Sequence, residues 1–161
     1  MMVEAKIYQD LKNDHDKHRA LFDKLQKTNG DNSKRRELFE DLRTELQAHA
    51  AAEEEALYST MLKDPDLRDS ARHSVAEHKE IDDLLGELME ADMNTSDWED
   101  KFGGLQHRYI HHIDEEEEEM FPEAAAGLSS AEEKEAARTF EERKPKELEI
   151  AEEQKPGDDR D

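Results

Sequence analysis

Four histidines and two glutamates in this sequence have residue types and spacings suited to binding metal ions. They recur at a constant shift along the chain: His15, His49 and Glu53 in the first half correspond to His78, His112 and Glu116 in the second. In each half the second histidine and the glutamate form a His-x-x-x-Glu pair, which a helix would place on one face. Imidazole nitrogens and carboxylate oxygens are ligands of iron and manganese. The spacing therefore predicts a metal site built from both halves of the chain.

The apolar residues around these side chains repeat with the same shift, which indicates a duplicated pair of helices. Leu42, Leu46, Leu57 and Tyr58 of the first half correspond to Leu105, Tyr109, Met120 and Phe121 of the second. Apolar residues at helical spacing predict four amphipathic helices, over about residues 4–28, 33–62, 65–93 and 96–121. Similar lengths and short connections then predict an all-α fold, an up-down-up-down four-helix bundle.

Turn and capping residues set the expected ends of these helices. Residues 29–32 have turn chemistry, and Asp64-Pro65 predicts an N-cap followed by a proline at the first helical position. Ser96 and Glu99 form a predicted capping box for the fourth helix, which is expected to end near Phe121-Pro122.

The chain after Gly127 is predicted to form a short acidic helix and a tail. A capping box from the serines at 129–130 and the glutamates at 132–133 would open a helix that runs to about Arg143. From Lys144 onward, prolines, a glycine and many charges predict a frayed or disordered tail. The expected division is a bundle over residues 1–128 and a C-terminal helix and tail over residues 129–161.

Counting residues from the turns places all four histidines at one height. His15 precedes the first turn by about 15 residues and His49 follows it by about 17, at about 1.5 Å of rise per residue. His78 and His112 both lie about 17 residues from the third turn, so they are at the same distance from that turn along the bundle axis. A single layer of histidines near the middle of the bundle is therefore expected.

Helical phase predicts which polar residues face this layer. In the fourth helix, His112 and Glu116 fall in or beside the apolar arc, and in the third helix His78 is central to it. The polar residues expected on solvated faces are His73, Glu77, His107, His111, Glu115, Glu117, Glu118 and Glu119.

Four imidazoles and two carboxylates in one core layer would be costly to bury unless they were paired. Two metal ions remove this cost, because two glutamates can bridge the ions while each histidine pair caps one of them. Each ion would have about four protein ligands, which leaves positions open for O₂, peroxide or NO on an octahedral ion.

Two further polar residues have open roles. A single interior histidine is more often a hydrogen-bonded core residue than a ligand. His18 is not duplicated, because the equivalent position in the second half of the chain is Ile81. His18 is therefore either an additional or supporting ligand or a hydrogen-bonded helix histidine. Tyr109 is either a core aromatic residue or a redox group.

Composition excludes several classes of function. The net charge of −22 argues against binding to nucleic acid or to an anionic membrane. The absence of cysteine excludes disulfides and thiolate metal sites. The N-terminal MMVEAKIYQD lacks the features of a signal peptide, and no stretch approaches 18 apolar residues, so a cytoplasmic location is expected.

The stretches HAAAEEEALY and HIDEEEEEMFP, with the two lone histidines, resemble the bacterial hemerythrin-like HHE cation-binding domain family over about residues 5–122. The resemblance implies a four-helix bundle holding two iron ions in a non-haem di-iron centre, carboxylate- and oxo-bridged. The ligands it implies are His15, His49, Glu53, His78, His112 and Glu116.

The sequence departs from oxygen-carrying hemerythrins, which have a His-x-x-x-His pair on the third helix and a His-x-x-x-x-Asp pair on the fourth. Here Ser74 stands four residues before His78, and His112 pairs with Glu116. One iron thus has one histidine fewer, unless His18 supplies it. The departure disfavours reversible O₂ carriage by a site of that type.

The function expected from these residues is that of a di-iron protein that binds or reacts with O₂, peroxide or NO. Its role would be in peroxide or oxidative stress or in iron handling, with a peroxide-consuming, catalase-like activity as one form. The alternatives are an O₂ carrier or sensor module and a metal-free acidic interaction protein. The expected partner is a small diatomic ligand or peroxide, and nothing in the sequence identifies a protein partner.

Overall fold

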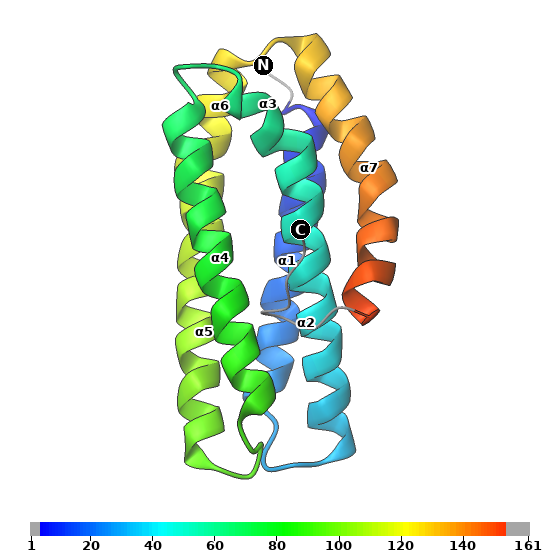
Figure 1. Ribbon diagram of the computed structural model, residues 1–161, viewed down its shortest axis with the longest axis vertical. Helices are drawn as coiled ribbons and strands as arrows, with labels where there is room; N and C mark the ends of the chain where they lie inside the picture. Colours follow the sequence, from blue (N-terminus) through cyan, green and yellow to red (C-terminus); the bar gives the residue numbers. More distant parts are fainter. Residues whose placement is uncertain (1–3, 154–161) are drawn as a thin grey trace.

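The computed structural model describes residues 4–153 of the 161-residue chain, and this range is helical without any strand (Figure 1). Four antiparallel helical segments, each called a rod here and some made of several consecutive helices, form the predicted all-α bundle. A fifth rod packs outside the bundle against the first two. The elements are α1 (Lys6–Gln26), α2 (Ser33–Glu53), η1 (Glu54–Tyr58), α3 (Ser59–Leu62), α4 (Arg68–Glu90), α5 (Ser96–Glu115), η2 (Glu116–Met120), α6 (Phe121–Gly127) and α7 (Ser130–Glu153). The second rod runs from α2 through η1 to α3, and the fourth runs from α5 through η2 to α6.

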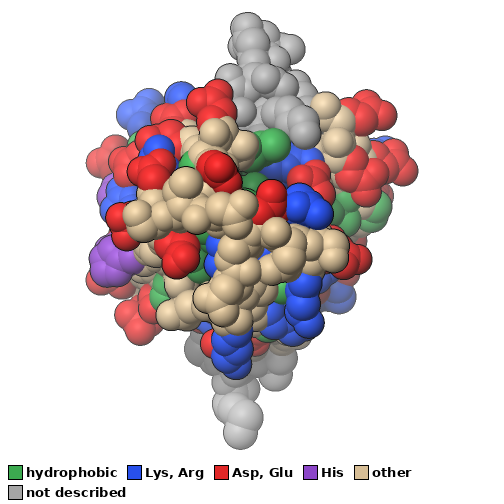
Figure 2. Space-filling model, turned by 90° about the horizontal axis from the view of Figure 1, so that it is seen from below, with side chains coloured by type: hydrophobic (Ala, Val, Ile, Leu, Met, Phe, Trp, Pro, Cys, Tyr) green, Lys and Arg blue, Asp and Glu red, His purple; other side chains and the backbone are tan. Residues whose placement is uncertain are grey.

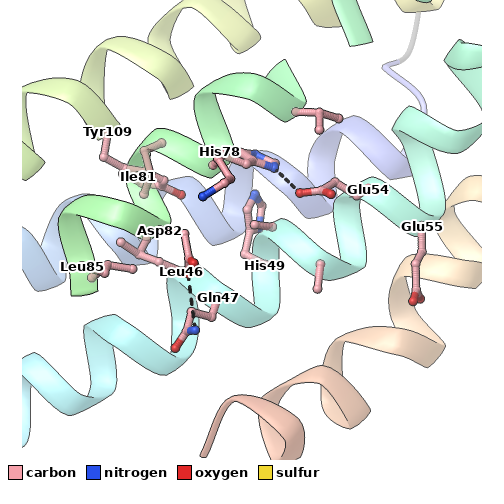
Figure 3. Close-up of a pocket in the computed structure, with 14 residues that line it drawn as sticks. Leu46, Gln47, His49, Glu54, Glu55, His78, Ile81, Asp82, Leu85 and Tyr109 are labelled. Atoms are coloured by element: carbon pink, nitrogen blue, oxygen red, sulfur yellow. Dashed lines mark hydrogen bonds and ion pairs between the residues drawn. The ribbon is translucent and has the colours of Figure 1, made fainter. Parts of the chain in front are cut away.

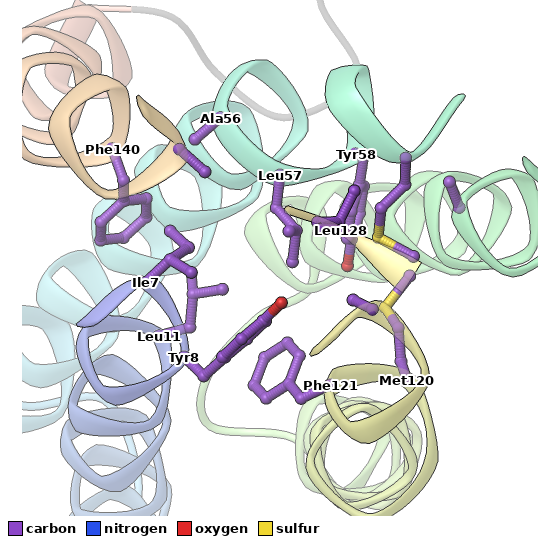
Figure 4. Packing of buried hydrophobic residues seen from close by; sticks show 14 of the residues in the cluster. Ile7, Tyr8, Leu11, Ala56, Leu57, Tyr58, Met120, Phe121, Leu128 and Phe140 are labelled. Carbon is purple, nitrogen blue, oxygen red and sulfur yellow. The ribbon is translucent and has the colours of Figure 1, made fainter. Parts of the chain in front are cut away.

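The apolar core is divided into two clusters, one toward each end of the bundle. The first joins the start of α1, the η1–α3 segment, the start of α4, the η2–α6 segment and α7, and Figure 4 shows Ile7, Leu57, Phe121 and Phe140 within it. The second joins the end of α1, the start of α2, the end of α4 and most of α5. The four histidines and two glutamates predicted to bind metal lie between the two clusters.

The two turns at the lower end of the bundle are tied together. Gly30 has a φ of 66°, which glycine adopts without steric cost, and a Cβ at this position would lie 3.2 Å from Asn94 Oδ1. The same Asn94 oxygen accepts a hydrogen bond of 2.7 Å from the backbone N–H of Asp31. Figure 2 shows this end of the molecule, where acidic and basic side chains surround the turns.

Two predicted helix starts differ from the structure. The third long helix begins at Arg68 rather than after Asp64-Pro65, because Asp64 Oδ1 accepts from the N–H of Asp66 and so stabilises a separate turn. The N-cap of α5 is Thr95, whose hydroxyl accepts from Trp98 N–H, rather than Ser96.

The capping box before α7 is confirmed. The backbone N–H of Ser129 donates to Glu132 Oε1 at 2.9 Å, and the backbone N–H of Glu132 donates to Ser129 Oγ at 3.1 Å. This reciprocal pair satisfies two donors at the start of the helix and fixes where the chain turns away from the bundle.

The fourth rod does not end near Pro122, as the sequence predicted, but continues to Gly127. The turn before the proline is already widened, since the N–H of Phe121 bonds to the carbonyl of Glu116 five residues back. A proline that follows such a π turn meets a hydrogen-bond ladder already displaced from α-helical geometry, and the helix persists.

The last helix is also longer than predicted, since α7 passes through Pro145 and extends to Glu153. Its buried residues Phe140, Glu147 and Ala151 continue one stripe across the exposed proline. Lys144 lies between Asp14 and Glu45, at 2.8 and 3.1 Å from their carboxylate oxygens. Packing and ion pairing therefore outweigh the loss of one backbone donor at Pro145. The predicted tail beyond position 153 lies outside the described residues.

The surface of the described chain is mostly polar. Ile150, at 41% exposure, is the one large hydrophobic side chain that residues 4–153 leave exposed. Over the same residues, none of the helices has both the length and the apolar character needed to cross a bilayer.

Candidate metal centre

The six predicted ligands meet at the centre of the bundle and are called here the His/Glu layer. Its members are His15 from α1, His49 and Glu53 from α2, His78 from α4, His112 from α5 and Glu116 from η2. All six side chains are buried, with exposed fractions no higher than 7%. Side chains from four separate rods thus form one polar group within an apolar core.

Each glutamate of the layer lies between two histidines from different halves of the chain. Glu53 Oε1 is 3.5 Å from Nε2 of both His49 and His78. Glu116 repeats this relationship, with Oε1 3.1 Å from His15 Nε2 and Oε2 4.0 Å from Nε2 of the histidine four residues before it. The duplicated sequence has therefore folded into a nearly two-fold arrangement of donor atoms.

These side chains form two overlapping groups of metal donors. One group combines His78 and His112 with both glutamates, and the other combines His15 and His49 with Glu116. Within each group the donor atoms all lie within 4.8 Å of one another. Two ions at these positions would each have a pair of histidines and would share a glutamate.

Several donor atoms of the layer are buried without a hydrogen-bond partner among the described residues. They are Nε2 of His15 and His49, both carboxylate oxygens of Glu53 and Oε1 of Glu116. A buried carboxylate without a partner costs several kcal/mol, so such a cluster is unfavourable unless a cation or protons occupy its centre. The unpartnered nitrogens and oxygens of the His/Glu layer are therefore suited to binding metal ions.

A carboxylate holds the outer nitrogen of each histidine in the layer. The hydrogen bonds run from His15 Nδ1 to Glu117 at 2.7 Å, from His49 Nδ1 to Asp14 at 2.8 Å, from His78 Nδ1 to Glu54 at 2.8 Å and from His112 Nδ1 to Glu77 at 2.9 Å. An ionised carboxylate only accepts, so Nδ1–H must donate in every pair. In the neutral imidazole, Nε2 then carries the lone pair that faces the glutamates, which is the form that binds a metal.

Sequence phase alone missed these four residues, called here the outer carboxylates: Asp14, Glu54, Glu77 and Glu117. The predictions that Glu77 and Glu117 face solvent were wrong, since Glu77 is 4% exposed and both bond to histidines of the layer. A carboxylate side chain is long enough to reach a histidine on the neighbouring helix from the edge of the apolar arc. The repeat could have found them, because the shift between the two halves also carries Asp14 onto Glu77 and Glu54 onto Glu117.

The layer attracts protons when it has no other cation. Burial by itself lowers the pKa of His15, but the adjacent carboxylates of Glu116 and Glu117 outweigh burial and raise the pKa to about 9. Burial likewise lowers the pKa of His78, and the carboxylates of Glu53 and Glu54 raise it to about 10. Bound metal ions would take the place of these protons.

A single turn of π-helix begins at or directly after the glutamate of the layer in each half. In the second rod η1 begins directly after Glu53, and in the fourth rod η2 begins at Glu116 itself. Such widened turns are common at functional sites because they change the direction of the side chains that follow. The sequence predicted continuous α-helices here and gave no sign of the widening.

Tyr58 is a further polar group at the layer that sequence reasoning missed. It is fully buried, its hydroxyl donates to Glu116 Oε2, and its ring stacks on His78 with centroids 5.3 Å apart. Burial and the nearby carboxylates raise the pKa of Tyr58 above its usual value, so the phenol keeps its proton. Ser74, four residues before His78, is also close to the hydroxyl of Tyr58.

His18 has partners at both ring nitrogens. Nε2 lies 3.2 Å from Glu45 Oε2, and Nδ1 lies 2.7 Å from the hydroxyl of Tyr109. Since the carboxylate accepts from Nε2–H, the hydroxyl of Tyr109 donates to Nδ1. Burial lowers the pKa of His18 to about 4, so the ring is neutral. His18 thus has the geometry of a hydrogen-bonded core histidine, and Tyr109 is held as its donor.

An open cavity of about 390 Å³ lies between α2 and α4, and Figure 3 shows His49, His78 and Tyr109 among the residues that line it. Leu46, Ile81 and other apolar side chains supply much of the wall. The cavity therefore forms a passage from solvent to His49 and His78. Its wall is largely apolar, and Glu54, Glu55, Lys79 and Asp82 also line it.

The exposed histidines are located as predicted. His73, His107 and His111 are all exposed, and His111 points its Nε2 to Glu115 at 3.3 Å rather than toward the layer. The rule that adjacent histidines on a helix face different directions thus separated His111 from His112 correctly.

Comparisons with known proteins agree with this description. The model of the hemerythrin HHE cation binding domain family matches residues 6–124. The chain is also similar to the crystal structure of a hemerythrin HHE cation binding domain-containing protein from Mycobacterium kansasii, at 25% identity and a TM-score of 0.78, covering 92% of this chain and 90% of that one. None of the curated proteins matches the chain. The family match spans the bundle and every residue of the His/Glu layer, and the chain belongs to the hemerythrin HHE cation-binding domain family.

Proposed function

We propose that this protein is a non-haem di-iron protein whose His/Glu layer reacts with small oxygen species, with hydrogen peroxide as the favoured substrate. The observation that carries the proposal is that both oxygens of Glu53 and Oε1 of Glu116 lie between four histidines without a hydrogen-bond partner among the described residues. Every one of those histidines has its outer nitrogen bonded to a carboxylate, which leaves Nε2 free to bind a metal.

The donor set favours iron over metals that need a closed site. Two histidines and shared glutamates give each ion about four protein ligands, fewer than the six of an octahedral ion. A closed structural site would leave no position for a substrate. A pair of iron ions held by the histidines and glutamates of the layer would supply the two electrons that, with two protons, convert one hydrogen peroxide to two waters, and oxidation of a second peroxide to O₂ would restore these electrons and protons.

The residues around the layer supply position, a proton and selection by charge. Tyr58 holds a proton beside Glu116 Oε2 and fixes the orientation of that carboxylate. The apolar passage between α2 and α4 reaches His49 and His78 and suits molecules that are small and uncharged. The net charge of −22 repels anions, whereas peroxide, O₂ and NO are neutral at pH 7.

The test is anaerobic reconstitution of the metal-free protein with Fe²⁺, followed by addition of hydrogen peroxide while peroxide and O₂ are measured. The expected result is two irons per chain and consumption of many equivalents of peroxide with release of half as much O₂. A long-lived, reversibly released O₂ adduct would instead support the O₂ carrier or sensor. A chain that binds no iron would support the metal-free interaction protein.

A further inference from the structure

A second cluster of metal donors lies on the surface between α4 and α5. His73 Nε2 is 3.1 Å from Glu115 Oε1 and 3.5 Å from Glu77 Oε1, and these donor atoms all lie within 4.8 Å of one another. His73 and Glu77 are one turn apart on α4, and Glu115 approaches from α5. One imidazole and two carboxylates suit a divalent ion such as Fe²⁺ or Mn²⁺.

The cluster stands in an acidic cleft of about 260 Å³ that extends to the His/Glu layer. Asp69, Glu77, Glu115, Glu119 and Glu123 line the cleft, and so does Glu116 of the layer. Glu116 is 2% exposed, and its Oε1 has no hydrogen-bond partner in the range 4–153. A buried carboxylate with one unpartnered oxygen thus lines the same cleft as the exposed His73.

Glu77 belongs both to the surface cluster and to the outer carboxylates that hold the His/Glu layer. Glu77 accepts the hydrogen bond of His112 Nδ1 at 2.9 Å, and the same oxygen is the one closest to His73. An ion held by His73 and Glu115 would therefore be next to the side chain that orients a histidine of the layer. Clefts lined by one sign of charge also concentrate counter-ions and raise their rates of association.

The surface cluster breaks the repeat, whereas the layer and the outer carboxylates follow it. The position in the first half that corresponds to His73 is Asp10, and the position that corresponds to Glu115 is Ala52. The first half of the chain thus lacks an equivalent cluster at these positions. The cluster is not a by-product of the duplication, and it distinguishes one side of the bundle.

We propose that His73, Glu77 and Glu115 form a loading site at which a divalent cation binds before it passes along the cleft to Glu116 and His112. This inference rests on the proposed function, because the buried layer is the destination of the ion. The two openings of the bundle then have different roles. The acidic cleft between α4 and α5 admits cations, and the apolar passage between α2 and α4 admits neutral substrates.

The test is stopped-flow uptake of Co²⁺ by the metal-free protein, with Co²⁺ absorption as the signal and metal analysis as the endpoint. The double variant His73→Ala, Glu115→Gln removes the surface donors and leaves Glu77 in place. The control is His107→Ala, which removes an exposed histidine of α5 outside the cleft. The double variant should fill the layer at least about tenfold more slowly, in line with the effect of charge focusing on association rates.

The number of Co²⁺ ions bound per chain should also differ between the variants. Wild type and control should bind two ions tightly and a third weakly, and the double variant should lose the third ion alone. Equal uptake rates in all three proteins, with two ions in each, would overturn the loading site and leave the proposed function intact. A wild-type chain that binds one ion, lost in the double variant, and none in the layer would support the surface site and contradict the proposed function.

Discussion

Asp14 and Glu77 occupy equivalent positions in the two halves of the chain, and each accepts a hydrogen bond from Nδ1–H of the histidine in a His-x-x-x-Glu pair. The two distances are 2.8 and 2.9 Å. The duplication therefore extends beyond the predicted ligands to the carboxylates that hold them. Outer groups of this kind fix the ring orientation and the tautomer of a metal-binding histidine.

Weakening one of these outer groups should lower metal affinity without unfolding the protein. Glu77→Gln keeps the shape of the side chain but removes its negative charge. That charge increases the basicity of the His112 ring and so strengthens the bond from Nε2 to a metal ion. The expected loss is about 10- to 100-fold in affinity for Fe²⁺, measured by competition with a chelator. Glu80→Gln, an exposed neighbour on α4 that pairs with Arg108, is the control and should bind iron as wild type does.

Removing a glutamate of the layer should have a larger effect. Glu116→Ala leaves buried histidines and Glu53 without a shared partner, so the chain should lose metal and about 3–5 kcal/mol of unfolding free energy. Metal analysis and chemical denaturation measure the two effects. The control is His111→Ala, which lies on the exposed face and should change neither. Loss of metal from the His111 variant, with full metal in His112→Ala, would reverse the assignment of the two histidines.

The metal-free protein should become less stable as the pH rises above neutrality. In the folded chain the pKa values of His15 and His78 are raised from 6.5 to about 9 and about 10. Their stabilising contribution is therefore complete below about pH 6.5 and is lost as the pH passes through the raised values. Thermal unfolding between pH 6.5 and pH 10 tests this.

The metal-loaded chain is the control for that experiment, because it carries the same surface charges. Its Tm should fall much less over the same range, since bound ions replace the titrating protons. A metal-free chain whose Tm rises with pH would contradict the assignment of these protons to the layer.

Lys144 should matter for stability because it joins α7 to the bundle. Its ammonium group lies between Asp14 and Glu45, and its side chain is 13% exposed. Lys144→Ala should lower the free energy of unfolding by about 1–3 kcal/mol, as expected when charged hydrogen bonds are lost from a partly buried position. Lys146→Ala, an exposed change on the same helix, should leave it near wild type. Equal stability of the two variants would show that α7 is held by its apolar residues instead.

The repeat and the helical phase were sufficient to predict the bundle and the residues that meet at its centre. They work because His112 and Glu116 must share a face on any regular helix, whatever packs against it. They could not predict the outer carboxylates, since Glu77 and Glu117 reach the histidines from the edge of that face by virtue of their length and of the neighbouring helix.

The departures from regular helix geometry were also beyond local sequence rules. Pro122 ends a helix in most contexts, but here it follows the widened turn that begins at Glu116. Pro145 is tolerated because contacts on both sides of it, at Phe140 and Ala151, bind α7 to the bundle. The contacts of α7 with the bundle are tertiary contacts that the sequence of a single helix does not reveal.

The most direct test of the His/Glu layer is a crystal structure of the iron-loaded protein with anomalous diffraction measured at the iron absorption edge. Two iron peaks are expected, one bonded to Nε2 of His15 and His49 and the other to Nε2 of His78 and His112, with glutamate oxygens shared between them. A single peak in the layer, or iron bound through Nδ1, would contradict the two-ion arrangement. Iron found at His73 and Glu115 with none between Glu53 and Glu116 would contradict the proposed centre altogether.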